Sequence, residues 1–146
     1  MKVKQLSVFL ENRPGALSRP VKLLAQAKFN LLTLCLADTQ QFGILRLVVR
    51  DWEKAQRLLQ KEGFVVKTTD IVAVQVPDEP GGLAKILDGV ETAGVNVEYM
   101  YGFTLRQQSQ ALLAFRFDDP DKAIQALQQR GTHPVGPVEL FKRLEE

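Results

Sequence analysis

The chain contains an internal repeat at a spacing of 66 residues. The segment Asn12–Leu17 (NRPGAL) is matched by Asp78–Leu83 (DEPGGL), and Ala27–Asn30 (AKFN) is matched at the same spacing by Ala93–Asn96 (AGVN). A turn and a helix start that recur in register with the next landmark indicate a duplicated unit. The sequence therefore predicts two copies of one structural unit.

The first copy alternates strand-like and helical patterns. Leu17, Pro20, Val21 and Leu24 recur at helical spacing, which predicts an amphipathic helix ending near Ala27. The other expected elements are strands at Val3–Leu10, Leu31–Ala37 and Gly43–Arg50, a helix capped by Asp51, and a strand from Phe64 after a stop at Gly63.

The second copy repeats this order. Strands are expected at Val72–Val76, Val97–Phe103 and Ala111–Phe117, with helices at Gly82–Ala93 and from Asp119 to Arg130. The last segment has two interpretations. It forms a fourth strand weakened by Pro134, Gly136 and Pro137, or a short helix over Val138–Leu144 that Pro137 begins.

Each copy thus has the order β-α-β-β-α-β. This order predicts an α+β fold of two ferredoxin-like units in tandem, with antiparallel sheets and helices on one face. The expected domains are 1–69 and 70–146. The junction Lys67–Asp70 contains no Gly, Ser or Pro that would make a flexible linker.

Composition excludes several classes of function. The formal net charge is +2 and the cations are scattered, so nucleic acid is not an expected partner. No apolar stretch is long enough to span a membrane, and the N-terminus does not resemble a signal peptide. One cysteine rules out an internal disulfide and a multi-cysteine metal site. We expect a soluble cytoplasmic protein without metal or cofactor.

Catalytic constellations are missing from the sequence. Cys35 lies in an apolar strand and is expected to be a buried core thiol, and the single histidine, His133, is expected at the surface. The same topology occurs in RNA-recognition domains, which require exposed aromatics on two central strands. Phe115 and Phe117 have no aromatic partner on Val72–Val76. We expect no enzyme activity; the alternatives are an enzyme with unseen active groups or a structural partner without a ligand.

The segment from Leu10 to Arg19 (LENRPGALSR), followed by Phe29-Asn30-Leu31, resembles the opening of an ACT domain. It is most similar to the ACT domain of the regulatory (small) subunit of acetolactate synthase. The second copy is a looser match. The resemblance implies a tandem pair of ACT domains that binds a small effector, usually an amino acid, and passes the signal to a metabolic enzyme. It also implies that Asn30 and Asn96 contact the effector, and it makes a homodimer an expected assembly.

The chemistry of the repeated turn agrees with an amino-acid ligand. A glycine at a helix start lets the backbone approach a ligand, and unpaired N–H groups there attract a carboxylate. Asn12 or Asp78 can hold an ammonium group. Alternatively, the Pro-Gly turns are only structural and Asn12 caps the helix. The candidate ligand-binding residues are Asn12, Arg13, Pro14, Gly15, Ala16, Leu17, Asn30 and Leu31, with Asp78, Glu79, Pro80, Gly81, Gly82, Leu83, Asn96 and Val97 in the second copy.

We therefore expect a regulatory or sensor protein for a branched-chain or other apolar amino acid, because the positions around the site are Leu, Val and Ala. The two sites are expected to be unequal. Asp78 and Glu79 make the second turn acidic, so the first copy is the expected amino-acid site and the second is the expected structural copy.

Overall fold

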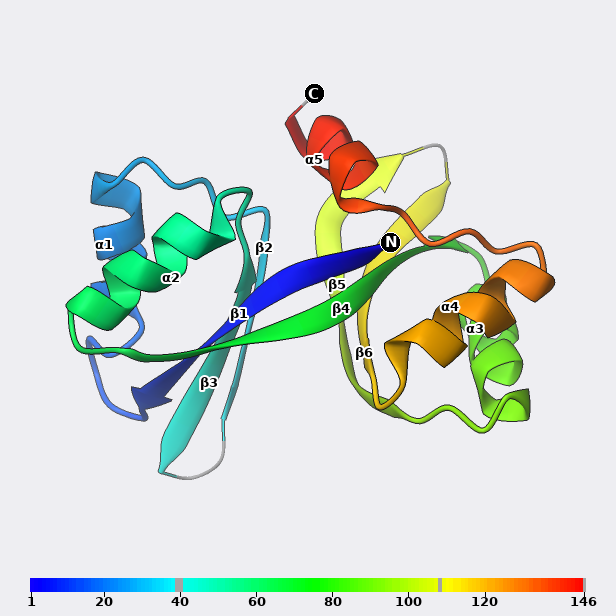
Figure 1. Cartoon of the computed structure of the whole chain (residues 1–146), viewed down its shortest axis with the longest axis horizontal. Helices are drawn as coiled ribbons and strands as arrows, with labels where there is room; N and C mark the ends of the chain where they lie inside the picture. Colours follow the sequence, from blue (N-terminus) through cyan, green and yellow to red (C-terminus); the bar gives the residue numbers. More distant parts are fainter. Residues whose placement is uncertain (39–40, 108, 146) are drawn as a thin grey trace. The chain divides into compact units, whose positions relative to one another are not determined.

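The computed structural model describes residues 1–38, 41–107 and 109–145. The chain divides into two compact units, which Figure 1 shows in sequence colours. One unit is Lys4–Thr69, and the other is Asp70–Glu146 together with Met1–Val3. No helix in the described part of the chain is long and apolar enough to cross a membrane.

The first unit has the predicted order of elements. Its strands are hydrogen-bonded in the order β2-β3-β1-β4, the ferredoxin-like arrangement. Its elements are β1 (Lys2–Glu11), α1 (Ser18–Gln26), β2 (Thr33–Asp38), β3 (Phe42–Val48), α2 (Trp52–Lys61) and the start of β4 (Val65–Pro77).

The core of the first unit lies between this sheet and helices α1 and α2. Leu6 and Val8 of β1 pair with Leu47 and Leu45 of β3, and all four side chains are buried in one cluster. Leu24 of α1 and Leu59 of α2 complete it. Leu17, which the helical spacing groups with Leu24, remains 37% exposed. Ala16 packs against the cluster instead.

The second unit repeats the architecture. The strand order β4-β6-β5 mirrors β1-β3-β2 of the first unit. Its further elements are α3 (Gly82–Thr92), β5 (Val97–Gln107), β6 (Gln110–Phe117), α4 (Pro120–Gln129) and α5 (Pro137–Glu145).

Aromatic rings fill the core of the second unit. Phe115 and Phe117 are fully buried and stack with their ring centroids 5.3 Å apart, within the cluster that Ile86 and Leu127 of the helices complete. Met100 also packs there. Because both phenylalanines are inside, they provide no stacking platform for RNA bases.

The end of the second copy is helical. Val138–Leu144 belongs to α5, so the helical interpretation of this segment is confirmed. Val135 makes only an isolated bridge to Ala73 of β4. The first residues of β1 group with this unit, where Lys2 forms an ion pair with Asp121 at 3.1 Å. Pro134 and Pro137 lack the N–H groups that a fourth strand would need.

Two local expectations need correction. The strands expected on either side of Lys67–Asp70 form one continuous strand, β4, because this junction contains no residue that breaks a strand. Asp51 occupies the N-cap position of α2 but makes no capping hydrogen bond; its carboxylate pairs with Lys54 at 2.8 Å. Asp119 does cap α4, accepting from the Lys122 N–H at 3.1 Å.

Candidate functional site

The loop before α1 is a tight turn built around Gly15. The Ala16 N–H donates to the Arg13 carbonyl and the Arg19 N–H donates to the Gly15 carbonyl. Gly15 has a φ of +83°, a conformation that only glycine adopts without strain. The Asn12 N–H donates to the Gln41 carbonyl at 3.1 Å, which ties the loop to the residue before β3. Asn12 is not the helix cap, because Leu17 occupies that position.

An open pocket of about 480 Å³ lies against this turn. Three parts of the first unit line it: the end of β1 at 9–11, the loop at 13–16 with Arg19 of α1, and the turn at 63–65 between α2 and β4. This volume is within the range of small-molecule sites. The structure therefore brings the predicted residues Arg13, Pro14, Gly15 and Ala16 together at one pocket.

Arg19 is fixed in the wall of the pocket by two contacts. Its guanidinium carbon lies 4.7 Å from the centroid of the Phe64 ring, a cation–π contact. Its Nη2 donates to the carbonyl of Glu62 at 3.0 Å. These contacts join the first turn of α1 to the segment between α2 and β4.

A second hollow of about 400 Å³ shares Gly15 and Arg19 with the pocket. Ser18, Lys22 and Glu62 also line it. Arg19 therefore contributes to the walls of both hollows.

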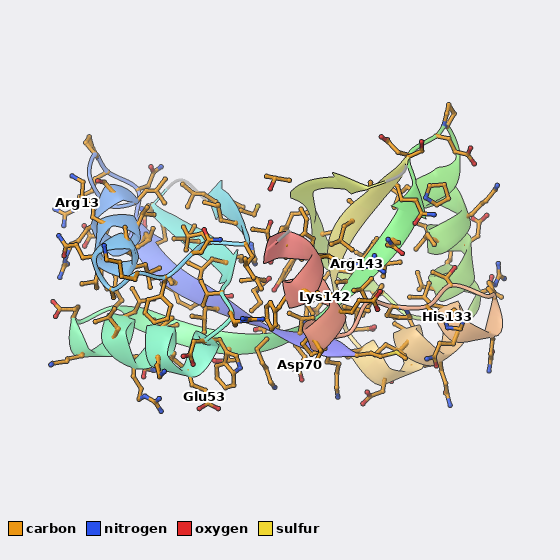
Figure 2. All side chains as sticks on the ribbon, turned by 90° about the horizontal axis from the view of Figure 1, so that it is seen from above. Arg13, Glu53, Asp70, His133, Lys142 and Arg143 are labelled. Atoms are coloured by element: carbon orange, nitrogen blue, oxygen red, sulfur yellow. The ribbon has the colours of Figure 1, made fainter. Side chains whose placement is uncertain are left out.

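The charges around the pocket are not equivalent. Arg13 is exposed, as Figure 2 shows, and its Nε pairs with a carboxylate oxygen of Glu11 at 2.8 Å. Among the described residues, no carboxylate pairs with the Arg19 guanidinium. Arg19 is thus the cation of the pocket wall whose charge is not neutralised by a neighbour.

Other residues predicted for the first site lie outside this pocket lining. Asn12 lies between the lining residues Glu11 and Arg13 but does not line the pocket itself. Asn30 is exposed just before β2, and Leu31 packs partly against the core. Leu17 is exposed at the start of α1.

The second turn has the same backbone. Gly81 has a φ of +85°, and the Lys85 N–H donates to the Gly81 carbonyl as Arg19 does to Gly15. The Asp78 N–H donates to the Ser109 carbonyl at 2.9 Å, and the Gly82 N–H to that of Glu79 at 3.0 Å. Glu79 and Pro80 are exposed in this turn.

The helix start in the second turn lies much closer to its strand. A Cβ atom on Gly82 would lie 2.1 Å from the carbonyl oxygen of Pro77. The equivalent residue in the first copy is Ala16, which has a Cβ atom. After the loop between β5 and β6 the spacing of the repeat is 68 residues, which aligns Gly63 with Gly131 and Phe64 with Thr132. Lys85 therefore has no aromatic ring at the matching position. The second turn therefore has no room for a side chain at the position where the first turn holds Ala16.

The remaining second-copy residues serve the fold. The Asn96 N–H donates to a carboxylate oxygen of Asp118 at 3.0 Å, and the Asn96 carbonyl accepts from the Asp118 N–H at 3.1 Å. Leu83 and Val97 pack against the core of the unit.

Two further expectations concern reactive side chains. His133 is exposed, as expected, and Figure 2 shows it at the outside of the second unit. Cys35 is only half-buried, so the expectation of a buried thiol was wrong. It lies on edge strand β2 opposite Arg46, on the sheet face away from the α1–α2 core.

The sequence interpretation missed Arg19 and Phe64 as pocket residues. One signal was available for Arg19: the repeat places a second cation, Lys85, at the same position of α3. Phe64 could not be found in this way, because its partner in the repeat is Thr132.

Comparison with known proteins agrees with this geometry. A family described as an ACT domain pair matches residues 1–138. The chain belongs to this ACT domain pair family. The acetolactate synthase small subunit of Haemophilus influenzae is 41% identical over 69 residues, 47% of this chain and 42% of the relative. That of Buchnera aphidicola is 34% identical over 77 residues, 49% of this chain and 48% of the relative. The ACT pair thus covers less than half the length of these relatives.

Solved structures show the same fold. A protein of Bacteroides thetaiotaomicron is 39% identical and superimposes with a TM-score of 0.90 over 97% of both chains. The regulatory subunit of aspartate kinase from Thermus thermophilus, in its ligand-free form, has a TM-score of 0.63 at 16% identity, over 86% of this ACT pair and 91% of the subunit. The similarity to the aspartate kinase subunit, at 16% identity, shows a common fold only.

Proposed function

We propose that this ACT domain pair is a sensor for an apolar amino acid, bound at the turn of the first domain. In this proposal the chain performs no catalysis and passes the binding signal to an enzyme of amino-acid metabolism. The proposed domains are 1–69 and 70–146. The names of the relatives support this role, since they are subunits of acetolactate synthase and of aspartate kinase.

The observation that carries the proposal is the difference between the two turns. Both have a left-handed glycine and the same helix start. The first turn lines a pocket of about 480 Å³, while Gly82 packs directly against Pro77 in the second. A turn that keeps a special backbone conformation and an adjacent pocket is suited to bind a ligand through its N–H groups.

The lining of the pocket supports an amino acid with an apolar side chain. Phe9, Leu10, Pro14, Phe64 and Val65 supply apolar surface, while Glu11, Arg13, Arg19 and the turn supply an equal or larger share of polar surface. Pockets that combine apolar walls with a few polar groups orient small ligands. The ligand backbone would lie at the polar turn and its side chain against the apolar wall.

A thermal-shift panel of the twenty amino acids tests the function. A ligand that binds only the folded state raises the melting temperature by mass action. We expect a rise with valine, leucine or isoleucine at millimolar concentration and none with charged amino acids. If no amino acid raises the melting temperature, the sensor function is wrong and the chain is a structural ACT protein.

Asn12→Ala tests the contribution of the predicted polar residue beside the pocket. We propose that its side-chain amide binds the ligand's ammonium group. The variant should keep its melting temperature without ligand and lose the ligand-induced rise. Asp78→Ala, the matched change in the second copy, should keep the rise. If Asn12→Ala and Asp78→Ala show the same ligand-induced rise in melting temperature, Asn12 does not bind the ligand.

A further inference from the structure

We propose that Arg19 is the residue that binds the carboxylate of the ligand in the first-domain pocket. This inference rests on the proposed amino-acid function and specifies which chemical group the site recognises. It adds a side chain that lies outside the repeated Pro-Gly turn.

The position of Arg19 favours this role because two contacts already hold its guanidinium against its own unit. The Phe64 ring supports one face of it at 4.7 Å, and the Glu62 carbonyl accepts one of its hydrogen bonds at 3.0 Å. A long side chain normally loses conformational freedom when it binds a ligand. Two contacts in the unliganded protein reduce that loss.

The hydrogen-bonding capacity of Arg19 is largely unused. A guanidinium has five N–H donors in a planar fork that matches a carboxylate. Within the part of the chain that the structure describes, the Arg19 guanidinium makes one hydrogen bond, to a backbone carbonyl, and Arg19 lines the pocket. The remaining donors are sufficient for a two-point contact with a carboxylate.

Charge distinguishes Arg19 from the other arginine at the pocket. Arg13 is paired with Glu11 at 2.8 Å, so an incoming carboxylate would compete with an existing partner. Arg19 has no such competitor among the described residues. The pocket therefore attracts an anionic group to the Arg19 side of the turn.

The second copy lacks this arrangement. Lys85 stands at the position of Arg19, and Thr132 stands at the position of Phe64. A lysine ammonium is a flexible point charge that lacks the planar fork. Lys85 is therefore the matched residue at which the same substitution should have no effect on binding.

Calorimetric titration with paired ligands tests the role of Arg19. L-Valine, L-leucine and L-isoleucine are each compared with their amides, which keep the ammonium group and side chain but lack the carboxylate charge. Arg19→Gln should weaken binding of the amino acid about tenfold or more, the scale of a charge-assisted hydrogen bond. Binding of the amide should change by less than about twofold. Lys85→Gln should change neither affinity.

Phe64→Leu provides a second variant that keeps the Arg19 charge but removes its aromatic support. It should weaken amino-acid binding less than Arg19→Gln does, and it should weaken the amino acid more than the amide, since both ligands contact the apolar surface of Phe64 but only the amino acid uses Arg19. If the wild-type protein binds an amino acid and Arg19→Gln binds it equally well, the role of Arg19 is wrong and the sensor function stands. If Arg19→Gln weakens the amide as much as the amino acid, Arg19 acts on the fold and not on the carboxylate. If the wild type binds no amino acid, both proposals fail.

Discussion

The carbonyl oxygen of Pro77 lies against Gly82, where a Cβ atom would be only 2.1 Å away. In the first copy the equivalent position holds Ala16, which lines the pocket and packs partly against the core. The first turn therefore holds a methyl group at the position where the second turn has no room for one. This difference explains why a duplicated motif need not give two equivalent sites.

Gly82→Ala should destabilise the protein by about 1–3 kcal/mol, because the helix start must move away from the strand. Ala16→Gly, the reverse change in the first copy, should cost less than about 1 kcal/mol, mostly through backbone entropy. Urea unfolding monitored by circular dichroism measures both changes. Equal costs would mean that the second turn has room for a side chain.

The two aspartates before α2 and α4 should differ in their contribution to stability. Asp119→Ala removes a capping hydrogen bond and should lower the free energy of unfolding by about 1 kcal/mol. Asp51→Ala removes only an exposed ion pair with Lys54, and its effect should be below about 0.5 kcal/mol. The same unfolding measurement distinguishes them. A larger loss for Asp51→Ala would contradict the assigned caps.

Helix α5 should be an integral part of the second unit. Leu140 is fully buried, so Leu140→Ala should cost about 2–5 kcal/mol. Val138 is 85% exposed on the same helix, and Val138→Ala should change stability by less than about 0.5 kcal/mol. Thermal unfolding of the two variants makes the comparison. If Leu140→Ala unfolds like the wild type, α5 does not pack as the structure describes.

The repeat predicted most of the fold because its signals are local. Pro-Gly turns, helical spacing and the glycines that end helices, Gly63 and Gly131, can be recognised from a few adjacent residues. These signals define where the strands and helices between them begin and end. Errors arose where neighbouring side chains compete for the same contact, which the spacing of apolar residues does not show. The exposure of Leu17 depends on Ala16 packing in its place, and the uncapped Asp51 depends on the nearby Lys54.

The candidate site was predictable only in part. The turn residues Arg13–Ala16 were found because they repeat in the sequence. The contact between Arg19 and Phe64 joins residues 45 positions apart, and only the folded unit brings them together. No spacing rule within one helix or strand links two such residues.

The central claim is that the first turn binds one amino acid per chain and the second turn binds none. Gly15→Ala and Gly81→Ala test it as a matched pair, because both glycines have a left-handed φ and both have open space at Cβ. Each substitution should cost about 1–2 kcal/mol of stability.

Calorimetric titration with valine, leucine and isoleucine measures the number of ligands bound by the wild type and the two variants. We predict one bound amino acid per chain for the wild type and for Gly81→Ala, and loss of binding for Gly15→Ala. Two ligands per wild-type chain, or loss of binding in Gly81→Ala with retention in Gly15→Ala, would contradict the account.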